Sequence, residues 1–245
     1  QIAGWIKMLG GTPRQFAIGR ERLVQSGQYA VPQMVSLLTD PDTADSLRER
    51  VLAVLPQLGR EAVRPLVEAL EISDVTVKEE IARVLGKIGY FHAAPALKEV
   101  AQNEKLPDRV RDTAIGALAA CAGRRALDKS AAELFYQLAL RYYREADSVM
   151  PDTRRDTANV WSYDKAGGVS YRAVPLPIFN EIHAMRSTAK ALEHDPDFAP
   201  AVPLWLASNL RKEAELPSGA KDPTVAADEP GARFYLLAAG TRYQQ

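Results

Sequence analysis

A glycine recurs along the first half of the chain at a nearly constant interval, and this repeat limits the possible folds more than any other feature. The intervals are 32, 30 and 34 residues, between Gly27, Gly59, Gly89 and Gly123. A proline follows within five or six residues in three repeats, and a lysine stands at the fourth place: Pro32, Pro65, Pro95 and Lys129. Such an interval is typical of a chain that repeats one supersecondary unit.

Apolar residues on both sides of each glycine predict a pair of helices. Before the glycine they recur three and four residues apart, and after the proline they stand at the second and fifth positions. Glycine ends a helix in the left-handed conformation, and proline fits the first turn of the next one. We therefore expect helices to end near each glycine. We also expect N-caps at Asp74 and Asp108, and burial of four equivalent residues, Leu37, Leu70, Val100 and Leu134.

The segment Pro107–Gly123 resembles a HEAT-like repeat of the phycobilisome-lyase type. It shares that family's aspartate, Val-Arg pair, spaced alanines and closing Ala-Leu and Gly, at Asp108, Val110, Arg111, Ala114, Ala117, Leu118 and Gly123. The resemblance covers roughly residues 12–146 and implies stacked antiparallel helix pairs. Each pair is too small to bury its own apolar face, so neighbouring units must cover it. The predicted fold class is an all-α, right-handed α-solenoid with one β-hairpin insertion.

The chain divides into three segments on this interpretation. Residues 1–146 form the HEAT-like domain, whose last helix, about residues 125–146, gains an aromatic face from Phe135, Tyr136, Tyr142 and Tyr143. In the linker 147–179, β-prone stretches at 160–163 and 169–174 flank a turn and predict a hairpin. Residues 180–245 resemble a tetratricopeptide repeat (TPR) at Ala184, Ala191, Leu192, Asp195 and Pro196. The closing residues look like a helix cut short, so we expect a piece of a longer chain.

Charge and composition narrow the function classes. The chain has 31 Lys and Arg residues against 31 Asp and Glu, which argues against a nucleic-acid partner. The longest apolar run, 114–122, is too short to span a membrane. The single cysteine, Cys121, and the scattered His92, His183 and His194 lack metal-ligand spacing. Two carboxylate pairs have structural explanations: Glu79-Glu80 suits a solvated helix face, and Asp195/Asp197 suits a helix exit. We expect no cofactor, no metal and no catalytic residues.

One cluster of residues suits partner binding. Arginine, tryptophan and tyrosine, which are enriched in binding hot spots, gather in the hairpin segment at Arg154, Arg155, Trp161, Tyr163, Tyr171 and Arg172. The competing interpretation is structural, with the aromatic rings filling the junction between the two helical modules. A second candidate surface follows the second helix of each repeat. Its positions carry mixed charges and are predicted to be exposed: Val35/Ser36, Glu68/Ala69, Lys98/Glu99 and Ala132/Glu133.

These features favour a non-enzymatic scaffold that binds a protein or peptide. Two alternatives stay open at this point. The chain could be a regulatory or targeting arm of a larger enzyme or envelope protein. The resemblance to phycobilisome lyases also implies attachment of a bilin to a cysteine of another protein, but it rests on the repeat alone. The sequence leaves the compartment and the oligomeric state open.

Overall fold

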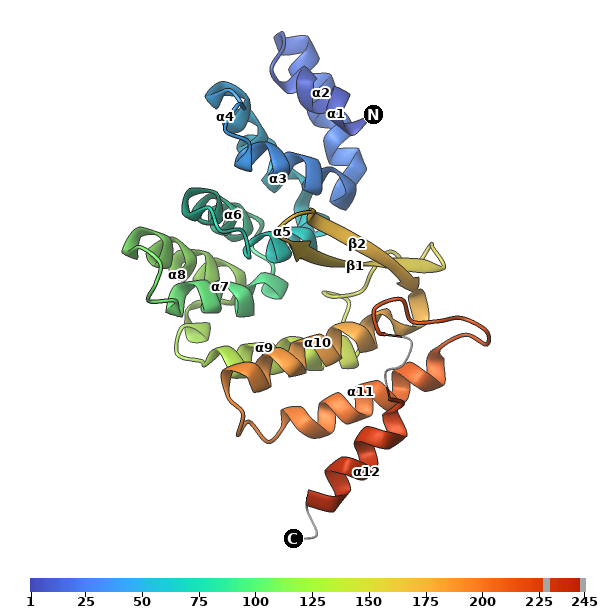
Figure 1. Cartoon of the computed structure of the whole chain (residues 1–245). Coiled ribbons are helices and arrows are strands. Elements are labelled where there is room, and N and C mark those ends of the chain that lie inside the picture. The colour runs from blue at the N-terminus through green and yellow to red at the C-terminus, as the bar shows by residue number, and fades with distance from the viewer. Residues whose placement is uncertain (227–229, 243–245) are drawn as a thin grey trace. The chain divides into compact units, whose positions relative to one another are not determined.

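The computed structural model describes residues 1–226 and 230–242, most of them helical (Figure 1). Two compact units divide the chain. Unit 1 comprises residues 1–129 and 161–170, and unit 2 comprises residues 130–160 and 171–245. Among the described residues, no helix is long and apolar enough to cross a bilayer.

Unit 1 is built from short helices that pack as successive pairs. The α-helices are α1 (Ile2–Leu9), α2 (Pro13–Ser26), α3 (Val31–Thr39), α4 (Asp45–Val54), α5 (Val63–Ala69), α6 (Val75–Ile88), α7 (Ala94–Gln102) and α8 (Asp108–Ala122). Short 3-10 helices join them: η1 (Gly27–Ala30), η2 (Leu55–Ala62), η3 (Phe91–Ala93) and η4 (Arg124–Ala126). Contacts run from α1 to α2, from α3 to α5, from α5 to α6, and from α8 to both α6 and α7. This is a helical repeat fold, as the glycine interval predicted.

The predicted glycine turns are present. α2, α6 and α8 each end one residue before their glycine, and all four glycines have positive φ, from 52° at Gly27 to 78° at Gly123. The second repeat differs, because α4 ends at Val54 and η2 continues through Gly59. Pro56 explains the early end, since it cannot donate the backbone hydrogen bond that would extend the α-helix.

The two predicted N-caps have different outcomes. Asp74 caps α6, where its Oδ1 accepts hydrogen bonds from Thr76 N at 2.8 Å and Val77 N at 3.0 Å. The prediction for Asp108 was wrong by one residue, because Pro107 occupies the N-cap of α8. Asp108 is instead the first helical residue, and its carboxylate pairs with Arg111.

The core of the repeats consists mainly of small aliphatic side chains. Leu70, Val100 and Leu134 are buried as predicted. Leu37 is only half-buried, and Leu38 takes the core position in its place. Close helix packing is clearest between α6 and α8, where a Cβ on Gly86 would stand 2.9 Å from the Cα and Cβ of Ala117.

Unit 2 contains four α-helices among its described residues. They are α9 (Ala131–Tyr143), α10 (Phe179–His194), α11 (Ala201–Glu215) and α12 (Ala232–Arg242), and η5 (Leu176–Ile178) precedes α10. α10 packs against both α9 and α11, and α11 contacts α12. The buried ring of Tyr142 packs against the rings of His183, at a centroid distance of 4.7 Å, and Phe179, at 6.3 Å.

α9 is shorter than the predicted helix over residues 125–146. A capping box starts it, in which Ser130 Oγ accepts from Glu133 N at 3.1 Å and Ser130 N donates to Glu133 Oε2 at 2.7 Å. It ends at Tyr143, and Glu145 then takes a positive φ of 53°. α9 lies in unit 2 with α10, whereas the sequence grouped it with the HEAT-like repeats.

The hairpin forms where it was predicted. Strands β1 (Thr157–Asp164) and β2 (Gly168–Pro175) make a two-stranded sheet. Asp164 Oδ1 closes the turn by accepting from Ala166 N at 2.8 Å and Gly167 N at 2.9 Å. At the open end, Leu176 N donates to Asp156 O at 2.9 Å. The boundary between the two units passes through this hairpin, with the turn in unit 1 and the strand ends in unit 2.

Candidate functional site

Trp161, the central residue of the predicted partner site, is buried in unit 1. Its side chain is 1% exposed, and its Nε1 donates a hydrogen bond to Gln28 Oε1 at 2.8 Å. Four consecutive residues of β1, from Ala158 to Trp161, are buried, so both faces of this strand are covered there. Tyr163, also on β1, is half-buried. These observations favour the structural interpretation for Trp161.

The exposed part of the predicted site lies in unit 2. Tyr171 is 46% exposed, and residues 171–173 of β2 all face solvent. Arg172 donates from Nη1 to the backbone oxygen of Pro223 at 2.8 Å. This bond ties the strand to the loop after α11, and it holds the guanidinium in a defined place.

The two arginines that precede β1 are exposed. Arg154 forms a two-pronged ion pair with Asp152, with Nε at 2.8 Å from Oδ1 and Nη2 at 3.0 Å from Oδ2. Hydrogen bonds from Arg154 lower the pKa of Asp152 to about 2. Because this pair is local, part of the charge on Arg154 is already balanced.

The second candidate surface, along the repeat helices, is less exposed than predicted. Glu68, Lys98 and Glu99 are half-buried, and Lys98 Nζ donates to Leu127 O at 2.8 Å. Only Ser36 and Glu133 are exposed, and three residues expected at the surface are buried: Val35, Ala69 and Ala132. The prediction of an exposed row was wrong at those three positions, because adjacent helices pack against both sides of these short helices.

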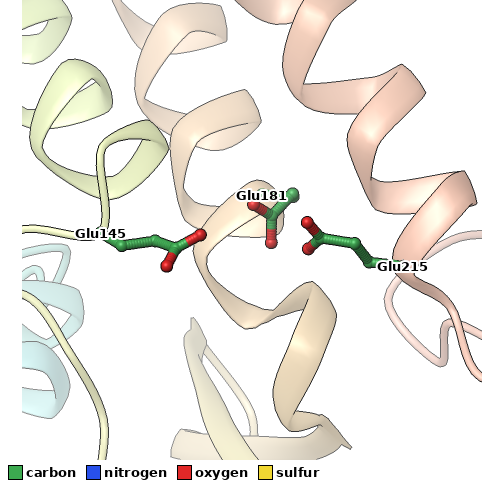
Figure 2. Close-up of side chains that lie close together, drawn as sticks. All are labelled: Glu145, Glu181 and Glu215. Carbon is green, nitrogen blue, oxygen red and sulfur yellow. The ribbon is translucent and has the colours of Figure 1, made fainter.

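A cluster of three glutamates in unit 2 was not anticipated from the sequence. One carboxylate oxygen from each of Glu145, Glu181 and Glu215 lies within 4.8 Å of the others. Figure 2 shows the carboxylates of Glu145 and Glu215 pointing toward Glu181 from opposite sides. Glu145 follows α9, Glu181 lies in the first turn of α10, and Glu215 is the last residue of α11.

Arg211, on α11, is the cation next to these glutamates. Both its Nε, at 2.7 Å, and its Nη2 donate to Glu181 Oε1, and Nη2 also donates to Tyr143 O at 2.8 Å. The Tyr143 ring lies 4.3 Å from the guanidinium carbon. Glu145 and Glu215 approach Arg211 only to 3.7 Å and 3.8 Å, which is beyond hydrogen-bond range.

Glu181 itself is in an unfavourable environment for a charge. Its side chain is 1% exposed, and its Oε2 is buried with no hydrogen-bond partner. Burial raises the pKa of this carboxyl above its usual value, although the hydrogen bond from Arg211 opposes the shift. The three glutamates lie on segments far apart in the sequence, so no local motif could have revealed the cluster.

Cys121 and His183 are buried, whereas His194 is exposed and stacks on one neighbouring ring. Cys121 Sγ donates to Leu85 O at 3.4 Å, and burial raises the pKa of the thiol to about 11, so it is a poor nucleophile. His194 stacks on Phe135 with ring centroids 5.7 Å apart, and His183 stacks on Tyr142. These contacts agree with the structural roles that the sequence favoured.

Comparison with known proteins supports a HEAT-like repeat protein. Residues 31–119, from α3 into α8, match the family model of HEAT repeats. No curated protein matches the chain. The match covers part of unit 1. It contains two of the four glycine turns, at Gly59 and Gly89, and Gly27 and Gly123 lie just outside its two ends.

Proposed function

We propose that this protein is a non-enzymatic scaffold that binds a protein or peptide partner. The observation that carries this proposal is the match of residues 31–119 to HEAT repeats, which are commonly protein-interaction scaffolds. The proposal includes right-handed stacking of the repeats and a TPR-like kinship of residues 180–245. It also includes an absence of enzymatic activity, which is typical of the HEAT repeat family.

The contact surface on unit 2 centres on Tyr171. Tyrosine supplies a large contact area at low entropy cost, and this side chain is 46% exposed on a strand whose neighbouring residues also face solvent. Arg172 follows Tyr171 on β2 and points to the opposite face of the strand, where Pro223 O already holds it, so a partner that wraps around this edge strand loses little rotamer freedom at Arg172. Arg154 and Arg155 add exposed positive charge before β1. A partner segment with acidic side chains suits this composition.

Unit 1 contributes a second, smaller set of contacts through Glu68, Lys98 and Glu99. Their half-buried stems leave only the charged ends for a partner, so we expect them to add specificity more than affinity. Trp161 and Tyr163 serve a different purpose in this proposal. The buried Trp161 anchors the hairpin turn to η1 through Gln28, and the half-buried Tyr163 supports it.

Site-specific photo-crosslinking tests the proposal without a known partner. A photoreactive phenylalanine analogue replaces Tyr171 in one variant and Ile115 in a control variant. Ile115 is 41% exposed on α8, so the two positions match in exposure. We expect a discrete crosslinked protein at position 171 and none at 115 in cells that make the protein naturally.

Alanine substitution then measures the energy of the contact. With the crosslinked partner purified, Tyr171→Ala should weaken binding by about 1–2 kcal/mol or more, as for a hot-spot residue, and Ile115→Ala should leave it unchanged. Equal crosslinking at both positions, or equal affinity of the two alanine variants, would show that β2 is not the contact surface.

A further inference from the structure

Three carboxylates and one guanidinium meet at the junction of α9, α10 and α11, and their charges do not balance. Glu145, Glu181 and Glu215 carry three negative charges when ionised, and Arg211 carries one positive charge, which leaves a formal charge of −2. Arg211 hydrogen-bonds only Glu181 among them, and its other acceptor is the neutral Tyr143 O. The guanidinium lies within ion-pair distance of Glu145 and Glu215, at 3.7 Å and 3.8 Å, but forms a hydrogen bond with neither.

The buried oxygen of Glu181 indicates what is missing. Oε1 accepts from two nitrogens of Arg211, whereas Oε2 has no hydrogen-bond partner and is buried. A buried carboxylate oxygen with no partner is costly. A proton, a buried water or a second cation can complete it, and of these only a cation also offsets the charges of Glu145 and Glu215. This orphaned oxygen belongs to the carboxylate toward which Glu145 and Glu215 point (Figure 2).

The separation of the carboxylates suits a shared ion. Ca²⁺ binds oxygen ligands at about 2.3–2.6 Å, so two ligands of one Ca²⁺ lie at most about 5 Å apart. The three ligand oxygens here lie within 4.8 Å of one another. All are carboxylate oxygens, which select a hard cation over zinc or copper.

Solvent reaches the cluster from two sides. The side chains of Glu145 and Glu215 are 52% and 38% exposed, whereas that of Glu181 is 1% exposed. The two exposed glutamates give solvent access to the edge of the cluster, and in the proposed site waters supply the remaining ligands that Ca²⁺ requires.

We propose that Glu145, Glu181 and Glu215 form a Ca²⁺ site at the junction of α9, α10 and α11. The ion neutralises the excess negative charge and binds the Glu181 oxygen that Arg211 leaves without a partner. It joins three segments that are separate in the sequence, so its binding stabilises unit 2. Mg²⁺ fits less well, because it requires shorter distances and a regular octahedron.

Calorimetry on the full chain tests the site directly. After treatment with EDTA and removal of the chelator, titration with CaCl₂ at neutral pH should show one bound ion per chain. Addition of Ca²⁺ should also raise the melting temperature, because the folded state binds the ion and the unfolded state does not. MgCl₂ should bind more weakly in the same experiment.

Two variants and a matched control assign the binding to these residues. Glu181→Gln and Glu215→Gln should each weaken Ca²⁺ binding by roughly tenfold or more, since ligand charge sets the affinity. Glu215→Gln keeps the test valid if the buried substitution disturbs folding. Glu193→Gln is the control, because Glu193 is an exposed glutamate of α10 that pairs with Lys190 at 2.9 Å; it should leave binding unchanged.

The opposite results would overturn the proposal. If the wild-type protein neither binds Ca²⁺ nor melts at a higher temperature with it, a proton or a buried water completes Glu181 and the site is not a Ca²⁺ site. If Glu181→Gln and Glu215→Gln bind Ca²⁺ as tightly as Glu193→Gln does, the ion binds elsewhere.

Discussion

Replacing Trp161 with alanine should destabilise the protein by about 3–5 kcal/mol, the usual cost of truncating a buried tryptophan. The side chain is 1% exposed. A buried aromatic ring removes about 150–250 Å² from water, and at about 25 cal/mol per Å² this area corresponds to about 4–6 kcal/mol. The two estimates agree, so the prediction rests on burial alone.

The indole nitrogen contributes a smaller part, which a second substitution isolates. Trp161→Phe keeps an aromatic ring but removes the donor that bonds Gln28 Oε1 at 2.8 Å. Because Gln28 is half-buried and water can reach it, the lost hydrogen bond should cost only about 0.5–1.5 kcal/mol, plus a small packing term.

Urea denaturation followed by far-ultraviolet circular dichroism measures both effects. The midpoint should fall in the order wild type, Trp161→Phe, Trp161→Ala, with an unchanged slope. Tyr171→Ala, on the exposed part of β2, is the control and should stay within about 0.5 kcal/mol of wild type. If Trp161→Ala were as stable as Tyr171→Ala, the ring would not belong to the core and the assignment of Trp161 as an anchor would be wrong.

Three further predictions concern the backbone, a helix cap and a titrating group. Gly89→Ala should lower the free energy of unfolding by about 1–2 kcal/mol, because Gly89 has φ 70° and ψ 40°. Gly116→Ala, in open space on α8, should instead raise it by about 0.5–1 kcal/mol. Chemical denaturation of both variants measures the two opposite changes. Ser130→Ala should cost about 1 kcal/mol through loss of the α9 cap, and an unchanged denaturation midpoint would contradict the capping box. Burial raises the pKa of Glu181, so its contribution to stability falls as pH rises through the folded-state pKa. In EDTA, the melting temperature of Glu181→Gln minus that of the wild type should therefore increase from acidic to neutral pH. If this difference decreased as the pH rises, the folded protein would favour the charged form of Glu181.

The glycine repeat was readable from the sequence because it depends on local backbone requirements. A positive φ suits glycine in almost any context, so Gly27, Gly89 and Gly123 mark helix ends without any knowledge of the neighbours. The hairpin was also local, since β-prone residues flanked a turn. The predicted helix bounds were wrong where another helix-end or helix-start residue was not considered. Pro56 ended α4 early, and the cap residue Ser130 began α9 later than expected.

The candidate partner site could be predicted only in part. Residue types in the hairpin segment indicated binding, but they did not distinguish Trp161, which is buried, from Tyr171, which is exposed. Alternation along a strand assumes one covered face, whereas consecutive residues of β1 are buried on both. Whether one face or both faces of the strand are covered depends on the elements that pack against it, so it cannot be read from the sequence of the strand itself.

Short-range rules made several features readable from the amino-acid sequence: the repeat, its glycine turns, the hairpin and most of the aliphatic core positions. Which charges meet depends instead on how the helices pack. Glu145, Glu181 and Glu215 come together because α10 packs against both α9 and α11, which brings the end of one helix beside the beginning of another. No spacing rule connects residues 30 or more positions apart, and a carboxylate's pKa depends on the burial and the neighbouring charges that this packing creates.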